Sequence, residues 1–240
     1  MGRTLRLIAD RVDAQSIPTV VVEHESLGAN LTRLVLSSPA FASATTDPCD
    51  VTAFRVSRTD FRHYTPAVLD QGRRELTIIV HRHGEGLGEE LIAGWSVGDD
   101  VKVCQWSSTR GFRWHDTTDP VVLLGDATVI SLAMAFAGRV ALEGRRALTV
   151  LEVDAADVVA TRHLVPDATV IAAGHEPGSA LDAWLTGHAH EIGALPRPAV
   201  YLAGHGQSIQ RQRAFLRESC ALDRRRISTQ PYWATGRSGL

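Results

Sequence analysis

The chain has 240 residues, of which 44% are hydrophobic and 22% are charged. This length is long for one domain, and the apolar fraction can fill a core in each of two. The net charge of -2 gives no reason to expect nucleic acid as a partner, and no stretch approaches the roughly 18 apolar residues of a membrane span. Cys49, Cys104 and Cys220 are widely separated, which indicates buried thiols in a reducing cytoplasm rather than disulfides.

Short β-type runs dominate the first half of the chain. Residues 1 to about 16 mix charges with few apolar side chains, so they predict a loose arm. Closely spaced strands separated by turn residues then predict an antiparallel β-barrel with one short helix at 87–93. The predicted strands are 19–23, 31–36, 52–56, 75–81 and 101–106.

Strands and helices alternate after the polar segment 114–119. The apolar run 121–124 breaks at Gly125 and Asp126 and leads into an amphipathic helix over 127–142. Such alternation predicts a doubly wound parallel α/β sheet. Further strands are predicted at 147–153, 169–172, 199–203 and 226–229, and further helices near 155–160, 179–186 and 207–219. We therefore expect a β-barrel at 17–116 and an α/β domain at 117–240, with a ligand cleft between them.

The turn at Gly125 and Asp126 lies where open α/β sheets bind phosphates and nucleotides. The glycine fingerprint G-x-G-x-x-G is absent, so a purely structural turn is an equally good interpretation. His81 and His83 have a spacing that can bind a metal on one strand face, but no third ligand is identifiable nearby. The sequence therefore predicts no metal site.

One strand end carries an R-x-Y-[ST] pattern, formed by Arg62, Tyr64 and Thr65. A strand with one exposed arginine and one core tyrosine would give the same letters, but other motifs follow in order. They are 83–86, 98–101, 124–128, 152–157, 201–204 and Tyr232-Trp233 with Gly236. Over about residues 20–237 this ordered set resembles the siderophore-interacting protein family of ferric-siderophore reductases.

The resemblance implies an FAD-binding β-barrel, an α/β domain that binds NADH or NADPH, and electron transfer from the nicotinamide through the flavin to chelated iron. It also implies site residues. For FAD they are Arg62, Tyr64 and Thr65, with His83, Gly84 and Gly86 at the pyrophosphate and Trp233 near the flavin; for the nicotinamide nucleotide they are Gly125, Asp126, Thr128 and Gly204. The tail residue Arg237 is a candidate to bind either the substrate, an acidic chelator such as a ferric siderophore, or a nucleotide phosphate.

The chain departs from the family pattern at the motifs themselves. Glu89 stands at the start of a predicted helix, where its charge would oppose a pyrophosphate, and Pro66 to Val68 replace an expected arginine. His205 and Ala234 replace an expected glutamate and arginine. These positions favour a second hypothesis, a biosynthetic enzyme that catalyses a non-redox cyclisation, isomerisation or rearrangement of a small intermediate.

Three residues are candidate catalytic groups, namely Thr65, Asp126 and His205. In the non-redox hypothesis, His205 and Asp126 follow parallel strands and would act as an acid-base pair, because histidine titrates near neutrality and an adjacent acid can orient it. A third class is a carrier that binds a flavin or a chelate tightly without turnover. None of the three hypotheses involves nucleic acid or a membrane.

Overall fold

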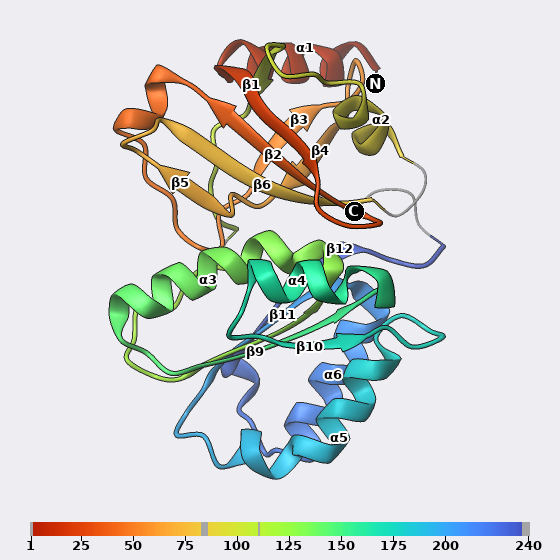
Figure 1. Ribbon diagram of the computed structural model, residues 1–240. Helices are drawn as coiled ribbons and strands as arrows, with labels where there is room; N and C mark the ends of the chain where they lie inside the picture. The colour runs from red at the N-terminus through yellow and green to blue at the C-terminus, as the bar shows by residue number, and fades with distance from the viewer. Residues whose placement is uncertain (1, 83–85, 110, 237–240) are drawn as a thin grey trace. The chain divides into compact units, whose positions relative to one another are not determined.

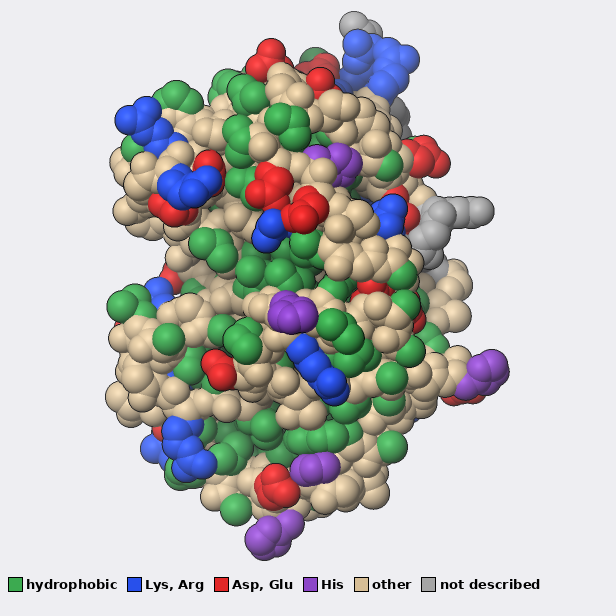
Figure 2. All heavy atoms as spheres, viewed as in Figure 1, with side chains coloured by type: hydrophobic (Ala, Val, Ile, Leu, Met, Phe, Trp, Pro, Cys, Tyr) green, Lys and Arg blue, Asp and Glu red, His purple; other side chains and the backbone are tan. Residues whose placement is uncertain are grey.

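The computed structural model describes residues 2–82, 86–109 and 111–236. Two compact units make up the chain, Met1–Ser108 and Thr109–Leu240, the first an antiparallel β structure and the second an α/β structure (Figure 1). On the face drawn in Figure 2, charged side chains of both signs lie in small separate groups. None of the helices in the described part of the chain has the length and apolar character of a membrane span.

The first unit contains two antiparallel sheets that are joined at their edges. The larger sheet has the order β5-β6-β2-β1-β7, and β3 pairs with β4. The bounds are β1 Ile17–Ser26, β2 Leu31–Ser37, β3 Thr52–Arg55, β4 Phe61–Tyr64, β5 Val68–Asp70, β6 Glu75–His81 and β7 Asp100–Val103, with a 3-10 helix, η1, at Pro39–Ala42. Backbone hydrogen bonds from Cys104 to Ala53 (3.0 Å) and from Ser107 to Val51 (3.2 Å) link β3 to the segment after β7. The antiparallel β domain predicted from the sequence is confirmed.

The core of this unit is made by the inward faces of its strands. Leu34 and Leu36 of β2 and Leu76 and Ile78 of β6 are fully buried, as period-two alternation requires. Helix α2 (Leu87–Ala93) adds Ile92 to the same apolar cluster. The predicted short helix is therefore present and packs directly on the core.

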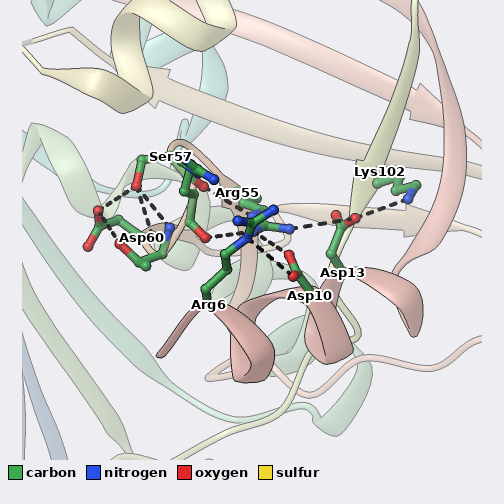
Figure 3. Close-up of polar contacts among 9 residues, drawn as sticks. Arg6, Asp10, Asp13, Arg55, Ser57, Asp60 and Lys102 are labelled. Carbon is green, nitrogen blue, oxygen red and sulfur yellow. Dashed lines mark hydrogen bonds and ion pairs between the residues drawn. The ribbon is translucent and has the colours of Figure 1, made fainter. Parts of the chain in front are cut away.

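The expectation of a loose N-terminal arm is wrong, because Gly2–Ala14 form helix α1. Asp10 accepts a hydrogen bond from Arg55 at 2.7 Å, and Asp13 pairs with Lys102 at 3.1 Å (Figure 3). Ala9, on the same helix, is only 2% exposed. Asp10 and Asp13 are among the charged residues from which a loose arm was predicted. They lie about one turn apart, and their contacts attach α1 to β3 and β7.

The second unit contains a five-stranded sheet in the order β10-β9-β8-β11-β12, in which every neighbouring pair is parallel. The strands are β8 Val121–Asp126, β9 Ala147–Val153, β10 Thr169–Ala172, β11 Ala199–His205 and β12 Ile227–Trp233. Helices α3 (Ile130–Glu143) and α4 (Val158–Leu164) cover one face, and α5 (Ser179–Gly193) and α6 (Gly206–Glu218) cover the other (Figure 1). Short 3-10 helices lie at Ala127–Val129, Ala155–Asp157 and Arg224–Arg226. The predicted doubly wound parallel sheet is confirmed.

The segment after Ser108 belongs to the second unit, before the boundary expected at 116/117. The Trp114 ring packs against Phe136 at 4.9 Å between centroids and stacks with Tyr201 at 6.0 Å. The backbone N–H of His115 donates to the Tyr201 hydroxyl at 2.8 Å. Arg145 lies 4.8 Å from the centre of the Trp114 ring and donates to the carbonyl of His115. The segment 114–119, predicted as a polar link, therefore begins with a tryptophan that packs on the second unit.

Candidate functional site

In the first unit, Arg62 and Tyr64 share one face of β4 and meet helix α2 at Gly88. A Cβ atom built on Gly88 would lie 2.6 Å from the Tyr64 hydroxyl oxygen and 3.1 Å from Cγ of Arg62. Only a glycine lets the helix approach both side chains this closely. The alternation predicted for the R-x-Y-[ST] strand therefore brings its cation and its aromatic ring to one place.

Tyr64 is held as a neutral phenol in apolar surroundings. Its ring lies 5.3 Å from that of Phe54, measured between centroids. Burial raises the pKa of Tyr64 to about 12, and the negative charge of Glu89 adds to the rise while Arg62 opposes it. Thr65, the next residue, is 5% exposed. This set offers a cation, a phenol and a hydroxyl, which fit the ring edge and ribityl chain of a flavin.

The start of α2 is less suited to a flavin diphosphate. Its N-cap residue, Gly86, provides no side-chain hydrogen bond, and both Glu89 and Glu90 lie in the first turn. A carboxylate already satisfies the positive end of a helix, and two unit charges 4 Å apart in water repel by about 1 kcal/mol. His83 and Gly84, predicted at the pyrophosphate, lie outside the described residues.

In the second unit, Asp126 ties the carboxyl ends of three strands together. One carboxylate oxygen accepts from the backbone N–H of Thr128 at 2.9 Å and from its hydroxyl at 2.5 Å. The other accepts from the backbone N–H of His205 at 2.8 Å and from the indole N–H of Trp233 at 2.8 Å. Four hydrogen bonds use the acceptor capacity of the carboxylate.

The neighbouring glycines are required by this packing. Gly204 has a φ of +108°, and a Cβ atom there would lie 2.4 Å from the Asp126 carboxylate. A Cβ atom on Gly125 would lie 2.1 Å from a methyl carbon of Val129. The structure thus gathers Gly125, Asp126, Thr128 and Gly204 at one edge of the sheet, and it gives each glycine a structural reason to be there.

His205 is 5% exposed and both its ring nitrogens contact protein groups. The Ser208 hydroxyl donates to the carbonyl of Pro177 at 2.7 Å, so it must accept from Nδ1–H of His205, 2.6 Å away. Nε2 is then the acceptor for the Thr235 hydroxyl at 3.0 Å. Burial lowers the pKa of His205, Asp126 opposes that shift and Arg211 adds to it. The imidazole is therefore neutral and protonated on Nδ1.

Asp126 pairs with His205 through the backbone of the histidine and not through its imidazole. The carboxylate binds the backbone N–H of His205, whereas the imidazole lies against the Trp233 ring, with 4.4 Å between centroids. Asp126 therefore orients the strand end rather than the imidazole. The partners Ser208 and Thr235 were missed from the sequence, although a serine three residues after the histidine at the start of α6 was a usable signal.

Two helix starts in this unit are filled by carboxylates, whereas a third has no side-chain cap. Glu152 of β9 accepts from the N–H groups of Gly178 and Leu181, at 2.9 and 2.8 Å, at the start of α5. Burial raises the pKa of Glu152. Asp126 caps the 3-10 helix before α3, but α6 has no side-chain cap and carries Arg211 in its second turn. The start of α6 is therefore a candidate to bind a nucleotide phosphate, although Arg211 is paired with Asp182 at 2.7 Å. Arg237 lies outside the described residues.

The family model described as siderophore-interacting protein matches residues 118–236. Among solved structures, a siderophore utilization protein from T. fusca is 22% identical, with a TM-score of 0.71 over 94% of this chain and 95% of that one. The siderophore-interacting protein SipS from Aeromonas hydrophila is 17% identical, with a TM-score of 0.69 over 93% of both chains. The FAD/NAD-binding domain of a Vibrio cholerae O1 biovar El Tor nitric oxide dioxygenase is 18% identical, with a TM-score of 0.68 over 92% of this chain and 99% of that one. These likenesses show the two-domain ferredoxin-reductase-like fold. Among curated proteins no match was found.

Proposed function

We propose, from the premise that the chain belongs to the siderophore-interacting protein family and has its ferredoxin-reductase-like fold, that it is a flavoprotein reductase. The substrate is a ferric siderophore, and the electron donor is NADH or NADPH. Such a reaction needs a cofactor that can take two electrons from the nicotinamide and release them singly to iron, and FAD would supply this chemistry. The family match and the full-length fold likeness support this reading.

The observation that carries the proposal is the group on β4. Arg62 and Tyr64 lie together against Gly88, and Thr65 follows directly. Tyr64 keeps its proton at neutral pH, because its pKa is about 12, and so donates a hydrogen bond to the ribityl chain. Arg62 supplies the positive charge that faces the anionic part of the cofactor, and Thr65 supplies the hydroxyl for the ring edge.

The second unit binds the nicotinamide nucleotide at the carboxyl ends of β8 and β11. The start of α6, where the helix has no side-chain cap, would hold its phosphates, and Arg211 in the second turn is paired with Asp182 at 2.7 Å. Asp126 holds Gly204, His205 and Trp233 in place and makes no proton transfer of its own, because its oxygens already accept four hydrogen bonds.

A second candidate is a non-redox enzyme that has kept the fold but not the cofactor. The specific observation in its favour is the pair of glutamates in the first turn of α2, where a flavin diphosphate would need to bind. In that case the imidazole of His205 is a candidate acid-base group, since burial lowers its pKa and keeps it unprotonated near neutrality.

Cofactor titration separates the two candidates. Fluorescence titrations of the purified chain with FAD and with riboflavin should both saturate, and Arg62→Ala should weaken FAD binding by about tenfold, the equivalent of one charge-assisted hydrogen bond. Glu89→Gln should strengthen FAD binding but leave riboflavin unchanged, because only FAD carries the diphosphate. Asp100→Asn, which removes an exposed carboxylate on β7, is the matched control. Saturating FAD that produces no change in fluorescence would remove the reductase and leave the non-redox enzyme.

A further inference from the structure

Helix α1 contacts both sheets of the first unit (Figure 3). Asp10 pairs at 2.7 Å with Arg55 of β3, in the two-stranded sheet. Asp13 pairs at 3.1 Å with Lys102 of β7, in the larger sheet, and its carboxylate also lies 4.0 Å from the Arg55 guanidinium. Ala9 of the same helix is buried. The helix can therefore fix the two-stranded sheet relative to the larger one.

Arg55 also holds the turn between β3 and β4. Its Nε–H donates to the carbonyl of Ser57 at 3.1 Å, and the Nη2 group that binds Asp10 also donates to the carbonyl of Arg58 at 2.6 Å. A guanidinium is planar and carries its N–H donors in a fixed fork, so one side chain can hold a turn and a helix in a defined geometry. The Arg55 side chain is 22% exposed, which partly shields its ion pair from water.

The opposite face of the β3–β4 hairpin carries groups of the proposed flavin site. The strands pair antiparallel, with Phe54 directly opposite Arg62. Because side chains alternate along a strand, Arg62 and Tyr64 lie on the face away from Arg55. The Phe54 ring lies 5.3 Å from the Tyr64 ring, between centroids, and belongs to the same apolar cluster as Ile92 of α2. A shift of the hairpin would therefore move Arg62 and Tyr64 relative to α2.

The hairpin depends on its neighbours for a fixed position, because a two-stranded sheet has little stability of its own. At Ala53 a backbone hydrogen bond from Cys104, 3.0 Å long, holds β3 to the segment after β7. The turn at 56–60 lies at the other end of β3, beyond that bond. There the side chain of Arg55 supplies hydrogen bonds to two turn carbonyls and to α1. Arg55 thus stabilises the end of the hairpin from which β4 starts.

We propose that α1 is a brace for the β3–β4 hairpin, and that Arg55 is the positioning residue through which it holds Arg62 and Tyr64 in place for a flavin. This role rests on the flavin site of the proposed function and adds to it a residue on the far face of the strand. Arg55 acts through the position of the hairpin, so its loss lowers the affinity for the ring and ribityl chain of the flavin and not only for the diphosphate.

Fluorescence titrations of the full chain with riboflavin and with FAD test this role. Arg55→Gln should weaken the binding of both flavins by the same factor, about fivefold, which is near the upper end for loss of a partly exposed ion pair. Asp10→Asn should also weaken both, by about threefold, although it removes a negative charge and a purely electrostatic effect would strengthen the binding of FAD. The double variant should bind both flavins no more weakly than Arg55→Gln alone, since the two residues act through one contact.

Arg73→Gln is the matched control, because it removes another ion pair of the first unit, with Glu75 of β6, and should leave both affinities unchanged. Amide hydrogen exchange of the flavin-free chain supplies a second measurement. Arg55→Gln should speed exchange at residues 52–64 by about fivefold and leave the second unit unchanged. Exchange separates a displaced hairpin from a chain that fails to fold, in which protection would be lost throughout.

Unchanged flavin affinity in Arg55→Gln overturns the proposal, and so does unchanged exchange at residues 52–64. A loss confined to FAD, with riboflavin binding as in the parent chain, also overturns it, because Arg55 would then act only through its charge. A parent chain that binds neither flavin refutes the proposed reductase itself, and the flavin role of Arg55 falls with it. Titration of the parent chain alone tells that last outcome apart from the others.

Discussion

Replacing Asp126 with asparagine should destabilise the second unit strongly while changing its volume very little. The carboxylate accepts two hydrogen bonds on each oxygen, from Thr128 on one side and from His205 and Trp233 on the other. An amide can accept on one side only, because its nitrogen is a donor. If the amide nitrogen faces His205 and Trp233, both N–H donors lose their acceptor and face another donor. If it faces Thr128, only the backbone N–H of Thr128 does so, because the threonine hydroxyl can turn and accept from the amide.

The magnitude follows from the less costly amide orientation, in which one hydrogen bond to the carboxylate is lost. Such a bond to a charged group contributes about 1.5 to 3 kcal/mol, so its loss should lower the free energy of unfolding by about 2 kcal/mol or more. That is a large part of the roughly 5 to 15 kcal/mol that stabilises a typical protein. In thermal unfolding, the corresponding shift of Tm is about 5 to 10 °C for a unit of this size.

Urea and thermal unfolding of Asp126→Asn, followed by circular dichroism and tryptophan fluorescence, measure this effect. Asp167→Asn is a suitable control, because Asp167 is exposed and its replacement should change the free energy of unfolding by less than about 0.5 kcal/mol. If Asp126→Asn were as stable as that control, Asp126 would not be the tie between the strand ends, and the account of this edge of the sheet would be wrong.

Three further predictions concern other parts of the structure. Gly88→Ala should displace Tyr64, weaken flavin binding in titrations and cost about 1 to 3 kcal/mol in urea unfolding, since its Cβ would lie 2.6 Å from the phenol oxygen; unchanged flavin affinity would count against the β4 site. Asp10→Asn combined with Asp13→Asn should speed amide hydrogen exchange in α1 while lowering global stability by about 1 kcal/mol or less, because these ion pairs are partly exposed; unchanged exchange would mean that the pairs do not hold the helix. Burial keeps the pKa of His205 below its unfolded value of about 6.5, so the unfolded chain takes up the proton first and stability is lost as pH falls below that value. His205→Gln should flatten this slope in unfolding measurements between about pH 7 and pH 5, and a slope identical to that of the parent would exclude His205 as its cause.

The larger features of the fold could be predicted from the sequence because they depend on periodic burial. The run 121–124 is buried on both faces and became the centre of the parallel sheet, with α3 ending at Gly144 in a left-handed conformation. Prediction failed where a few specific contacts decide the structure. Helix α1 is attached by Asp10 and Asp13, and the neighbouring sequence does not indicate that their cationic partners lie on β3 and β7. The short strand β5 was missed because three residues give no readable period.

The candidate site was predictable in its membership more than in its chemistry. The ordered motifs predicted Asp126, Gly204 and Trp233 as cofactor-binding residues. In the structure both Gly204 and Trp233 lie against Asp126. The direction of each hydrogen bond could not be predicted, because it depends on how β8, β11 and β12 end relative to one another. That direction is what makes Asp126 a structural tie and leaves the His205 imidazole bound to Ser208 and Thr235.

The most direct test of the proposed reductase is anaerobic spectroscopy of the purified chain loaded with FAD. On mixing with NADH or with NADPH, the visible flavin absorbance should disappear, and it should return when a ferric siderophore is added, with ferrous iron trapped by a chelator in a ratio of about two per nicotinamide consumed, because each nicotinamide carries two electrons. A chain that binds no FAD, or whose bound FAD keeps its absorbance with both nucleotides, would contradict the proposal.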